Sequence, residues 1–241
     1  MSIAIKFATW NVGSLLADLD KNTEALAEAV KDDKPDVLCM QELPSFPKLW
    51  DKIKQNGSFQ YFYYYETSES HVAEGWNMGI GVFSKYPLSD IIVRELTRPT
   101  ERIFYGGKEE FWHRKFFLKA TLTVNNTELL LFSGHGFPFY RYGLLEEEHD
   151  FVYREIDAFV SEYAREGESY IICTDFNAYD AVRFMPFVSV THRDVFAGIP
   201  TRPTGRKTDA IVIPKECEPL LVKNSIVQGM DHNYLSVLLS I

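Results

Sequence analysis

The sequence is poor in cysteine: its 241 residues include only Cys39, Cys173 and Cys217. Three cysteines cannot pair completely, and no two of them have the spacing of a CxxC metal motif. Free cysteines are typical of a reducing compartment, so we expect a cytoplasmic protein. Cys39 and Cys173 lie within apolar segments, where they are expected to act as small buried residues.

Long hydrophobic runs are absent as well. The longest apolar stretches, such as residues 129–132, have the length of a strand, whereas a membrane helix needs about 20 apolar residues. In the amino-terminal segment MSIAIKFATWN, Lys6 interrupts the apolar residues and no small-residue cleavage site follows. We therefore expect no membrane span, and we interpret this segment as a first strand rather than a signal peptide.

Positive charge is in deficit, because 25 Lys and Arg face 34 Asp and Glu and give a formal net charge of −9. Non-specific binding to duplex DNA depends on cationic side chains, so this balance disfavours nucleic acid as the partner but leaves a local basic cleft open. A content of 46% hydrophobic and 15% aromatic residues excludes disorder. With no repeat, low-complexity tract or linker, we predict a single domain over residues 1–241.

Nine segments have the pattern of strands and three have helical periodicity. Strands in this number, with helices between them, predict an α/β sandwich of two mixed sheets stacked face to face with helices outside. A single doubly wound sheet is the alternative, although no GxGxxG or GxxxxGK[ST] motif supports its nucleotide-binding versions. The predicted strands cover 3–10, 37–40, 59–65, 78–84, 116–124, 128–133, 170–174, 209–213 and 234–240, and the predicted helices cover 23–31, 48–55 and 144–166.

Apolar strands of this chain repeatedly run into an acid, an amide or an imidazole. Taken singly, such residues are explained as caps of turns. Strand ends that converge on one rim would crowd carboxylates together, and a cation or hydrogen bonds must then offset their repulsion. Oxygen ligands without a cysteine or multi-histidine set favour Mg²⁺ or Mn²⁺, so phosphoester hydrolysis follows as a hypothesis. The residues concerned are Asn11, Glu42, His135, Asp175, Asn177, Asp209, Asp231 and His232.

The motifs TWN, QE, SGH, TDFN, TDAIV and MDH, in this order, resemble those of the endonuclease/exonuclease/phosphatase superfamily. This superfamily includes pancreatic deoxyribonuclease, apurinic-site endonucleases, neutral sphingomyelinases and inositol polyphosphate phosphatases. The resemblance extends from Asn11 to His232, and the ordered set is more specific than any one motif. It implies a four-layered α/β/β/α sandwich, in agreement with the pattern of strands and helices.

The resemblance also implies roles for the metal-side and water-side residues. Glu42 resembles the principal metal ligand of the family, with Asn11 and Asp231 nearby in the metal shell. Asp175 resembles the residue that orients or deprotonates the attacking water. Asn177 is similar to the residue that hydrogen-bonds a phosphate oxygen.

Two histidines complete the implied site. His232 resembles the phosphate-contacting histidine, with Asp209 as the carboxylate that orients it. His135 resembles the second histidine of the deoxyribonuclease-like members, which contacts phosphate or the leaving oxygen. Glu74 is a candidate partner for His135, as a glutamate is in some nucleases of the family, although an exposed turn acid is the simpler interpretation.

The chain departs from the family pattern at three places. Thr174 stands where the family usually has glycine, and Met230 stands where it usually has serine; neither side chain is itself catalytic. After His135, residues 136–140 form the aromatic and proline-containing segment GFPFY. We interpret this segment either as a specificity loop or as a packed loop.

Residues 98–115 and 201–207 form two basic stretches that could meet a substrate. The first mixes its cations with Phe104, Tyr105, Phe111 and Trp112, a combination suited to phosphate contacts and ring stacking. Solvated loop charge beside core aromatics is the alternative interpretation. The candidate substrate-binding residues are Arg114, Arg202, Arg206 and Lys207.

Together these observations predict a Mg²⁺-dependent phosphoester hydrolase, with Mn²⁺ as the alternative ion, that uses activated water and forms no covalent intermediate. The net charge favours a small-molecule or lipid-derived phosphoester as the substrate. A DNA nuclease or repair enzyme of the same superfamily is the second hypothesis. A non-catalytic binding module on the same fold is the third, because a fold alone does not specify activity. The oligomeric state is left open by the sequence.

Overall fold

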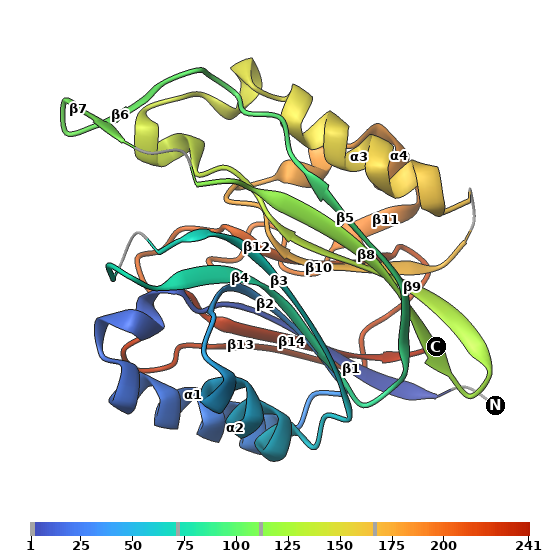
Figure 1. Ribbon diagram of the computed structural model, residues 1–241. Helices are drawn as coiled ribbons and strands as arrows, with labels where there is room; N and C mark the ends of the chain where they lie inside the picture. The colour runs from blue at the N-terminus through green and yellow to red at the C-terminus, as the bar shows by residue number, and fades with distance from the viewer. Residues whose placement is uncertain (1–2, 71–72, 111–112, 166–167) are drawn as a thin grey trace.

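The computed structural model describes residues 3–70, 73–110, 113–165 and 168–241. Two six-stranded sheets pack face to face, and helices cover their outer faces, so the protein has four layers (Figure 1). This arrangement confirms the predicted α/β/β/α sandwich. No helix within the described ranges is both long enough and apolar enough to cross a membrane.

The first sheet contains the amino-terminal strands. Its order is β13 (Leu221–Ser225), β14 (Tyr234–Ser240), β1 (Ala4–Asn11), β2 (Val37–Pro44), β4 (Asn77–Ser84) and β3 (Tyr61–Glu69). Strands β1 and β2 are parallel, and the other neighbours are antiparallel. Helices α1 (Leu19–Asp33) and α2 (Pro47–Gly57) cover its outer face (Figure 1).

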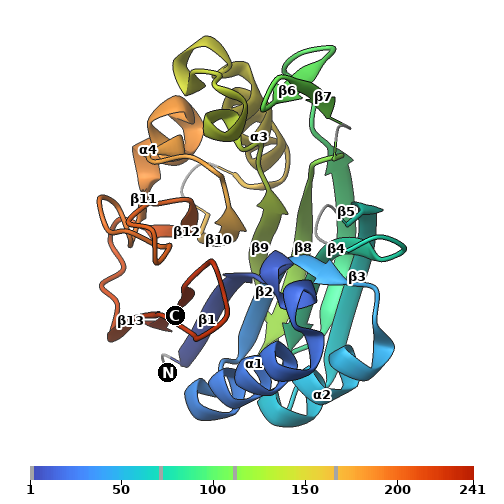
Figure 2. The ribbon, with the colours of Figure 1, turned by 90° about the vertical axis from the view of Figure 1, so that its left-hand side faces the viewer.

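The second sheet is built from the other half of the chain. Its order is β11 (His192–Asp194), β12 (Asp209–Pro214), β10 (Tyr170–Asp175), β9 (Thr127–His135), β8 (Phe116–Val124) and β5 (Leu88–Glu95). Strands β9 and β10 are parallel. Helices α3 (Phe151–Tyr163) and α4 (Pro186–Thr191) cover it, and a hairpin of β6 (Ile103–Tyr105) and β7 (Lys108–Glu110) projects beyond its edge (Figure 2).

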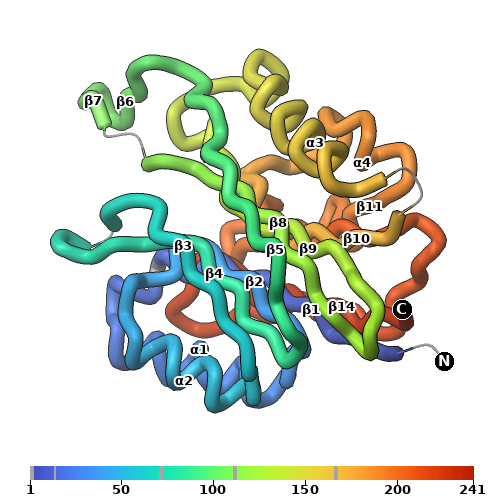
Figure 3. The backbone as a smooth tube through the Cα atoms, turned by 45° about the vertical axis from the view of Figure 1, so that its right-hand side comes forward, coloured from blue at the N-terminus to red at the C-terminus, as the bar shows by residue number. Residues whose placement is uncertain are grey.

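Each central strand is buried on both faces because one face meets the other sheet and one meets helices. In β1, Ile5 and Phe7 belong to the core between the sheets, whereas Ala8 and Trp10 belong to the core beneath α1 and α2. Two-sided burial explains the continuous apolar runs that the sequence shows at these strands. The ends of the chain meet at one side of the sandwich, where Ile3 N–H donates to the carbonyl of residue 241 at 2.8 Å (Figure 3).

All nine predicted strands are present, but the sequence did not reveal β5, β11 or β13. Strands β5, β11 and β13 lie at the edges of their sheets and have mixed, partly exposed side chains, so they lack a continuous apolar pattern. Helix α4 and the hairpin of β6 and β7 were not predicted because they are short. Helix α4 has six residues, and β6 and β7 have three residues each.

The helix predicted over 144–166 is shorter in the structure. A 3₁₀ turn occupies Glu146–Glu148, and His149 stacks on Phe139 with ring centroids 5.3 Å apart, so α3 begins only at Phe151. Leu145, which contributed to the predicted periodicity, is 57% exposed. The helix ends at Tyr163, and the predicted terminator, residue 167, lies outside the described residues.

Candidate active site

The register of the second sheet brings three of the predicted site residues side by side. Asp175, at the end of β10, is paired with His135 of β9 on one side and with Asp209 of β12 on the other. Asn11, at the end of β1 in the first sheet, reaches across and donates from Nδ2 to Asp175 Oδ2 at 2.9 Å. The candidate site therefore lies at the strand ends where the two sheets meet, on the side of the molecule that faces the viewer in Figure 2.

Asp209 and His232 form a buried ion pair. His232 Nδ1 lies 3.0 Å from both oxygens of Asp209, and the Thr208 hydroxyl donates to Asp209 Oδ2 at 2.9 Å. Burial alone would lower the pKa of His232, but the charge of Asp209 and its hydrogen bond outweigh burial and raise this pKa to about 9. The imidazole is therefore protonated at neutral pH, with Asp209 as its counter-ion.

Asp175 is fully buried beside this pair. Burial, followed by the charge of Asp209, raises the pKa of Asp175 to about 6, against the opposing effects of His232, Asn11 and Asn177. The backbone N–H of Asn177 donates to Asp175 Oδ1 at 2.7 Å, and His232 Nδ1 lies 3.8 Å from Oδ2. A carboxylate that titrates near neutrality and is held from three sides has the properties of a general base.

Asn177 is placed by an unusual backbone conformation, with φ at +54°. Asparagine tolerates this left-handed region better than most residues. Its Nδ2 donates to the carbonyl of Gly136 at 3.2 Å, and the residue lines the cavity described below. The side chain is thereby held next to the cavity by the loop that follows β9.

Glu42 owes its orientation to an irregularity in β2. The pairing of β2 with β4 shifts register between Met40 and Leu43, and Glu42 has φ at +52°. Regular alternation would place Glu42 beneath the helices with Met40, whereas the irregularity puts Leu43 there and leaves Glu42 to line the cavity. His135 Nε2 lies 3.4 Å from Glu42 Oε1.

Asn11 ties Glu42 to the site. Its Nδ2 donates to Glu42 Oε1 at 3.2 Å as well as to Asp175, and its Oδ1 accepts from the backbone N–H of Gly13 at 3.0 Å. The amide thus turns its nitrogen, not its oxygen, toward the two carboxylates. A Cβ atom at Gly13 would lie 2.0 Å from Glu42 Oε2, so only glycine leaves room for this carboxylate.

Asp231 and Arg202 form a second polar cluster at the cavity. Arg202 is ion-paired with the Asp231 carboxylate, donates from Nε to the Asp231 carbonyl at 3.1 Å, and donates to the Tyr140 hydroxyl at 2.7 Å. Asp231 Oδ2 is 3.8 Å from His232 Nε2. These contacts place Asp231 next to His232 but already bind it to Arg202.

Lys115 is a site residue that the sequence did not single out. It directly precedes β8 and is only 8% exposed, and its Nζ lies 3.0 Å from Nε2 and 3.1 Å from Nδ1 of His135. Burial lowers the pKa of Lys115 to about 8, although Glu42 and Asp175 oppose this change. The sequence placed Lys115 in a basic stretch, and only the tertiary structure reveals that it turns inward.

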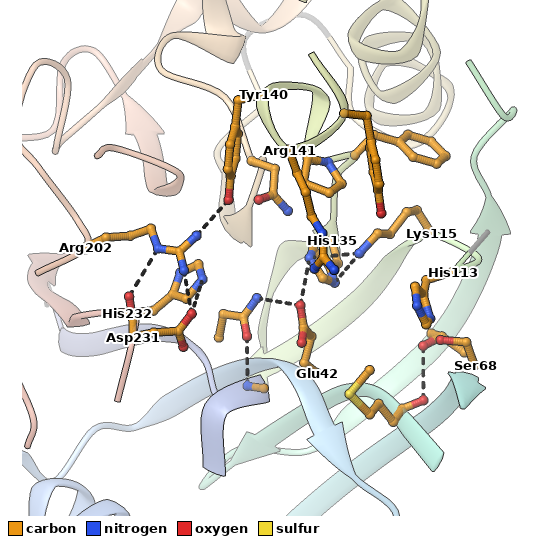
Figure 4. Close-up of a pocket in the computed structure, with 18 of the residues that line it drawn as sticks. Glu42, Ser68, His113, Lys115, His135, Tyr140, Arg141, Arg202, Asp231 and His232 are labelled. Atoms are coloured by element: carbon orange, nitrogen blue, oxygen red, sulfur yellow. Dashed lines mark hydrogen bonds and ion pairs between the residues drawn. The ribbon is translucent and has the colours of Figure 1, made fainter. Parts of the chain in front are cut away.

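These residues surround a cavity of about 940 Å³ (Figure 4). Its walls combine acidic, basic and aromatic side chains. They include Asn11, Glu42, Lys115, His135, Tyr140, Arg141, Tyr142, Asn177, Arg202, Arg206, Asp231 and His232. Asp175 and Asp209 lie behind this surface, fully buried. Such a cavity can hold a phosphate group and part of the molecule that carries it.

The four predicted substrate-binding residues have different surroundings. Arg114 lines the cavity, but both hydrogen bonds of its guanidinium go to Glu95. Arg202 and Arg206 line the cavity, and Arg206 lies over the Tyr140 ring at 4.2 Å. Lys207 instead forms a buried ion pair with Asp194 at 2.6 Å and is not among the described residues that line the cavity. Its position indicates a structural role.

Other sequence expectations are also resolved by position. Glu74 is exposed, and His135 contacts Glu42 and Lys115 instead. The loop at 136–140 combines the packed loop and the cavity-lining loop that the sequence offered as alternatives, because Phe139 is buried whereas Tyr140 lines the cavity. Two aromatics of the first basic stretch, residues 111 and 112, lie outside the described residues.

The carboxylates of the site offer two places for a metal ion. Ligand atoms of Asp175, Asp209 and His232 lie within 4.8 Å of one another, but Asp209 is already the counter-ion of His232, and Asp175 and Asp209 are both fully buried. Glu42 and Asp231 line the cavity itself and carry carboxylate oxygens, the ligands that hard divalent cations prefer. The cavity side of the site therefore has the better donor set.

Comparison with solved structures agrees with this fold. The protein is similar to an endonuclease/exonuclease/phosphatase from Beutenbergia cavernae, with a TM-score of 0.73, 14% identity and coverage of 99% of this chain and 72% of that one. A family protein from Leptotrichia buccalis gives a TM-score of 0.70 and 14% identity over 98% of this chain and 100% of that one. A mannosyl-6-phosphatase from Bacteroides thetaiotaomicron gives a TM-score of 0.65 and 17% identity over 98% of this chain and 100% of that one.

These identities establish a shared fold, and the family assignment comes from the sequence itself. No curated protein matches the chain. The model of the Endonuclease/Exonuclease/phosphatase family matches residues 8–206, which is most of the chain and includes all the motifs from Asn11 to the basic loop before Asp209. On this match and the buried acidic and histidine cluster, the chain belongs to the endonuclease/exonuclease/phosphatase family of metal-dependent phosphoesterases.

Proposed function

We propose that this protein is a Mg²⁺-dependent hydrolase of a small-molecule or lipid-derived phosphoester. The observation that carries the proposal is the convergence of Asp175, the Asp209–His232 ion pair and Glu42 at one cavity with basic and aromatic walls. The donor set fits Mg²⁺, because this ion usually takes one or two protein carboxylates and Glu42 and Asp231 supply them. Bound there, Mg²⁺ would neutralise charge that develops on the phosphoryl oxygens.

Side chains of the protein carry out the proton transfer and bind the phosphate. Asp175, with its pKa near 6, accepts a proton from the attacking water as the water oxygen bonds to phosphorus. The protonated His232 and the Asn177 amide bind phosphoryl oxygens as the ester P–O bond breaks. The leaving oxygen takes a proton from solvent water to become the alcohol, and Asp175 returns its own proton to solvent. Asn11 holds Asp175 and Glu42 in place from the first sheet. No nucleophilic side chain is needed, so no covalent intermediate forms.

The preference for a small substrate rests on charge and shape. The chain carries a net charge of −9, and its basic residues at the site face a cavity of about 940 Å³ rather than an open surface. A duplex needs several cations along an exposed face to replace its counterions. The mannosyl-6-phosphatase has a similar fold and is named for a small phosphoester, which supports the same preference.

The proposal is tested with a panel of substrates in Mg²⁺, Mn²⁺ and EDTA. The panel contains p-nitrophenyl phosphate, bis-p-nitrophenyl phosphate, and abasic, single-stranded and duplex DNA. We expect metal-dependent hydrolysis of a nitrophenyl ester and little cleavage of DNA. Preferential cleavage of DNA would favour the nuclease hypothesis, and a protein that binds phosphate without any turnover would favour the binding module.

The residue assignment needs matched variants. Asp175→Asn should lower turnover at least about 100-fold, since it removes the general base. Asp33→Asn removes another buried carboxylate, one that is ion-paired with Lys6 and lies outside the cavity, and should retain turnover if the variant folds. Full activity in a folded Asp175→Asn protein would refute the proposed role of this residue.

A further inference from the structure

Lys115 is a buried cation on which the charges of Glu42 and Asp175 act only from beyond ion-pair distance. Its Nζ contacts only the imidazole of His135, and no described carboxylate lies within ion-pair distance of it. An ammonium group removed from water is costly unless an opposite charge compensates it. Since Lys115 lines the cavity, a bound anion is in a position to provide that charge.

A second cation points to the same part of the cavity. Arg141 lies beside Lys115, close enough that its charge further lowers the pKa of the lysine, and both reach toward His135 in Figure 4. The Arg141 guanidinium is only loosely paired, with Glu110 at 3.5 Å, and its Nε is buried without an acceptor among the described residues. Two like charges brought together repel each other, and an anion between them would relieve this repulsion.

This pair of cations is additional to the groups assigned to the reacting phosphate. His232 and Asn177 bind that phosphate in the proposed mechanism, and Asp209 compensates the charge of His232. Arg202 is likewise neutralised by Asp231. Lys115 and Arg141 thus face the same part of the cavity without a close carboxylate partner among the described residues, whereas the exposed guanidinium of Arg206 lies over the Tyr140 ring.

We propose that Lys115 and Arg141 form a second anion subsite, and that the substrate is a phosphoester carrying a further phosphate or carboxylate group. The proposal rests on the proposed function, because it places the second group next to a phosphate held by His232 and Asn177. Tyr142 and Tyr105, over which the Arg141 guanidinium lies at 5.9 and 5.1 Å, hold this side chain at the subsite.

Binding of phosphonates, which the enzyme cannot hydrolyse at the P–C bond, tests the subsite. Methylphosphonate carries one anionic group, whereas ethane-1,2-diphosphonate and propane-1,3-diphosphonate carry two. Dissociation constants are measured by calorimetry with Mg²⁺ present for wild type, Lys115→Met, Arg141→Gln and Lys119→Met. Lys119 is the matched control, because it lies in β8, which Lys115 directly precedes, and is 7% exposed but donates to Thr121 and the Asp90 carbonyl and is not among the described residues that line the cavity.

We expect wild type to bind at least one diphosphonate about 10-fold or more tightly than methylphosphonate, the factor that one charged hydrogen bond supplies. Lys115→Met and Arg141→Gln should each reduce this ratio several-fold or abolish it, while Lys119→Met keeps it. Metal chelation by the diphosphonates is the same for all proteins and cancels in the comparison. Arg141→Gln keeps the test decisive if Lys115→Met does not fold.

Three results would overturn the subsite. These are no preference for any diphosphonate in wild type, an unchanged preference in both variants, or an equal loss for mono- and diphosphonates, which would assign Lys115 to the reacting phosphate. Failure of the proposed function looks different, because wild type would then turn over no phosphoester in the substrate panel, whatever its binding ratio.

Discussion

Asn11 and Asp175 belong to different sheets, yet the Asn11 amide donates to the Asp175 carboxylate at 2.9 Å. The same amide nitrogen contacts Glu42 at 3.2 Å, and its oxygen is fixed by the Gly13 N–H. One side chain thus positions the proposed general base and a proposed metal ligand. Each half of the sandwich supplies one part of the site, and Asn11 joins the two parts.

Replacement of Asn11 by alanine removes this connection. We expect Asn11→Ala to lower kcat/KM about 10- to 100-fold, the usual effect of losing a group that orients reacting residues. Because the Asn11 hydrogen bond lowers the pKa of Asp175, the acidic limb of the pH–rate profile should also move to higher pH. Asn56→Ala, which removes a helix-surface hydrogen bond to Lys52, is the control. An acidic limb that stays in place would contradict the assignment of Asp175.

The pH dependence of turnover should be bell-shaped. Activity rises as Asp175 loses its proton at about pH 6, because only the carboxylate accepts a proton from water. It falls as His232 loses its proton at about pH 9, because the neutral imidazole no longer stabilises the phosphoryl oxygens. The profile of kcat/KM against pH, measured at saturating metal, checks both limbs.

The Asp209→Asn variant tests which group produces the basic limb. Removal of the adjacent negative charge should lower the pKa of His232 by about 1 unit or more and bring the basic limb toward neutrality. Nuclear magnetic resonance titration of the imidazole measures the same pKa independently of turnover. Glu162→Gln, at an exposed ion pair with Arg94, should leave the profile unchanged. A basic limb near pH 9 in Asp209→Asn would assign that limb to another group.

Gly13 is predicted to control metal binding. In Gly13→Ala the new Cβ would lie 2.0 Å from Glu42 Oε2, so the carboxylate must move away. We expect the affinity for Mg²⁺ or Mn²⁺, measured by calorimetric titration, to fall about 10-fold or more. Gly75→Asn is a suitable control, because its Cβ meets open space and asparagine tolerates the positive φ of this position. Unchanged metal affinity in Gly13→Ala would place the ion away from Glu42.

Arg206 and Lys207 are neighbours in sequence but should affect different properties. Lys207→Met leaves Asp194 buried without its partner and should lower the free energy of unfolding by about 3–5 kcal/mol. Arg206→Ala removes an exposed guanidinium at the cavity and should raise KM severalfold with little change in stability. Urea denaturation and steady-state kinetics on both variants separate these effects. A raised KM with normal stability in Lys207→Met would reverse the two roles.

The sequence predicted the architecture well because the central strands are buried on both faces. Such strands, β10 and β12 for example, show continuous apolar runs with clear ends. The polar residues that follow them could be predicted to meet, since parallel strands end at the same edge of a sheet. An edge strand such as β13, in which three of five residues are exposed, gives no comparable pattern.

The finer features of the site depend on tertiary structure. Whether Arg206 or Lys207 faces the cavity is decided by how the loop enters β12, and composition does not record this direction. Lys115 has a long side chain whose inward course is set by the position of His135 on β9. The outward turn of Glu42 likewise depends on an irregular pairing of β2 with β4 that no local sequence pattern indicates.

The layer between the two sheets contains the free thiols Cys39 and Cys173, far from any solvent. Asn11 of one sheet reaches Asp175 of the other through a single hydrogen bond of 2.9 Å, so we expect added bulk in this layer to lengthen that contact. Turnover should therefore respond to the thickness of the interior, and a larger side chain at Cys39 is expected to silence the enzyme while the chain remains folded.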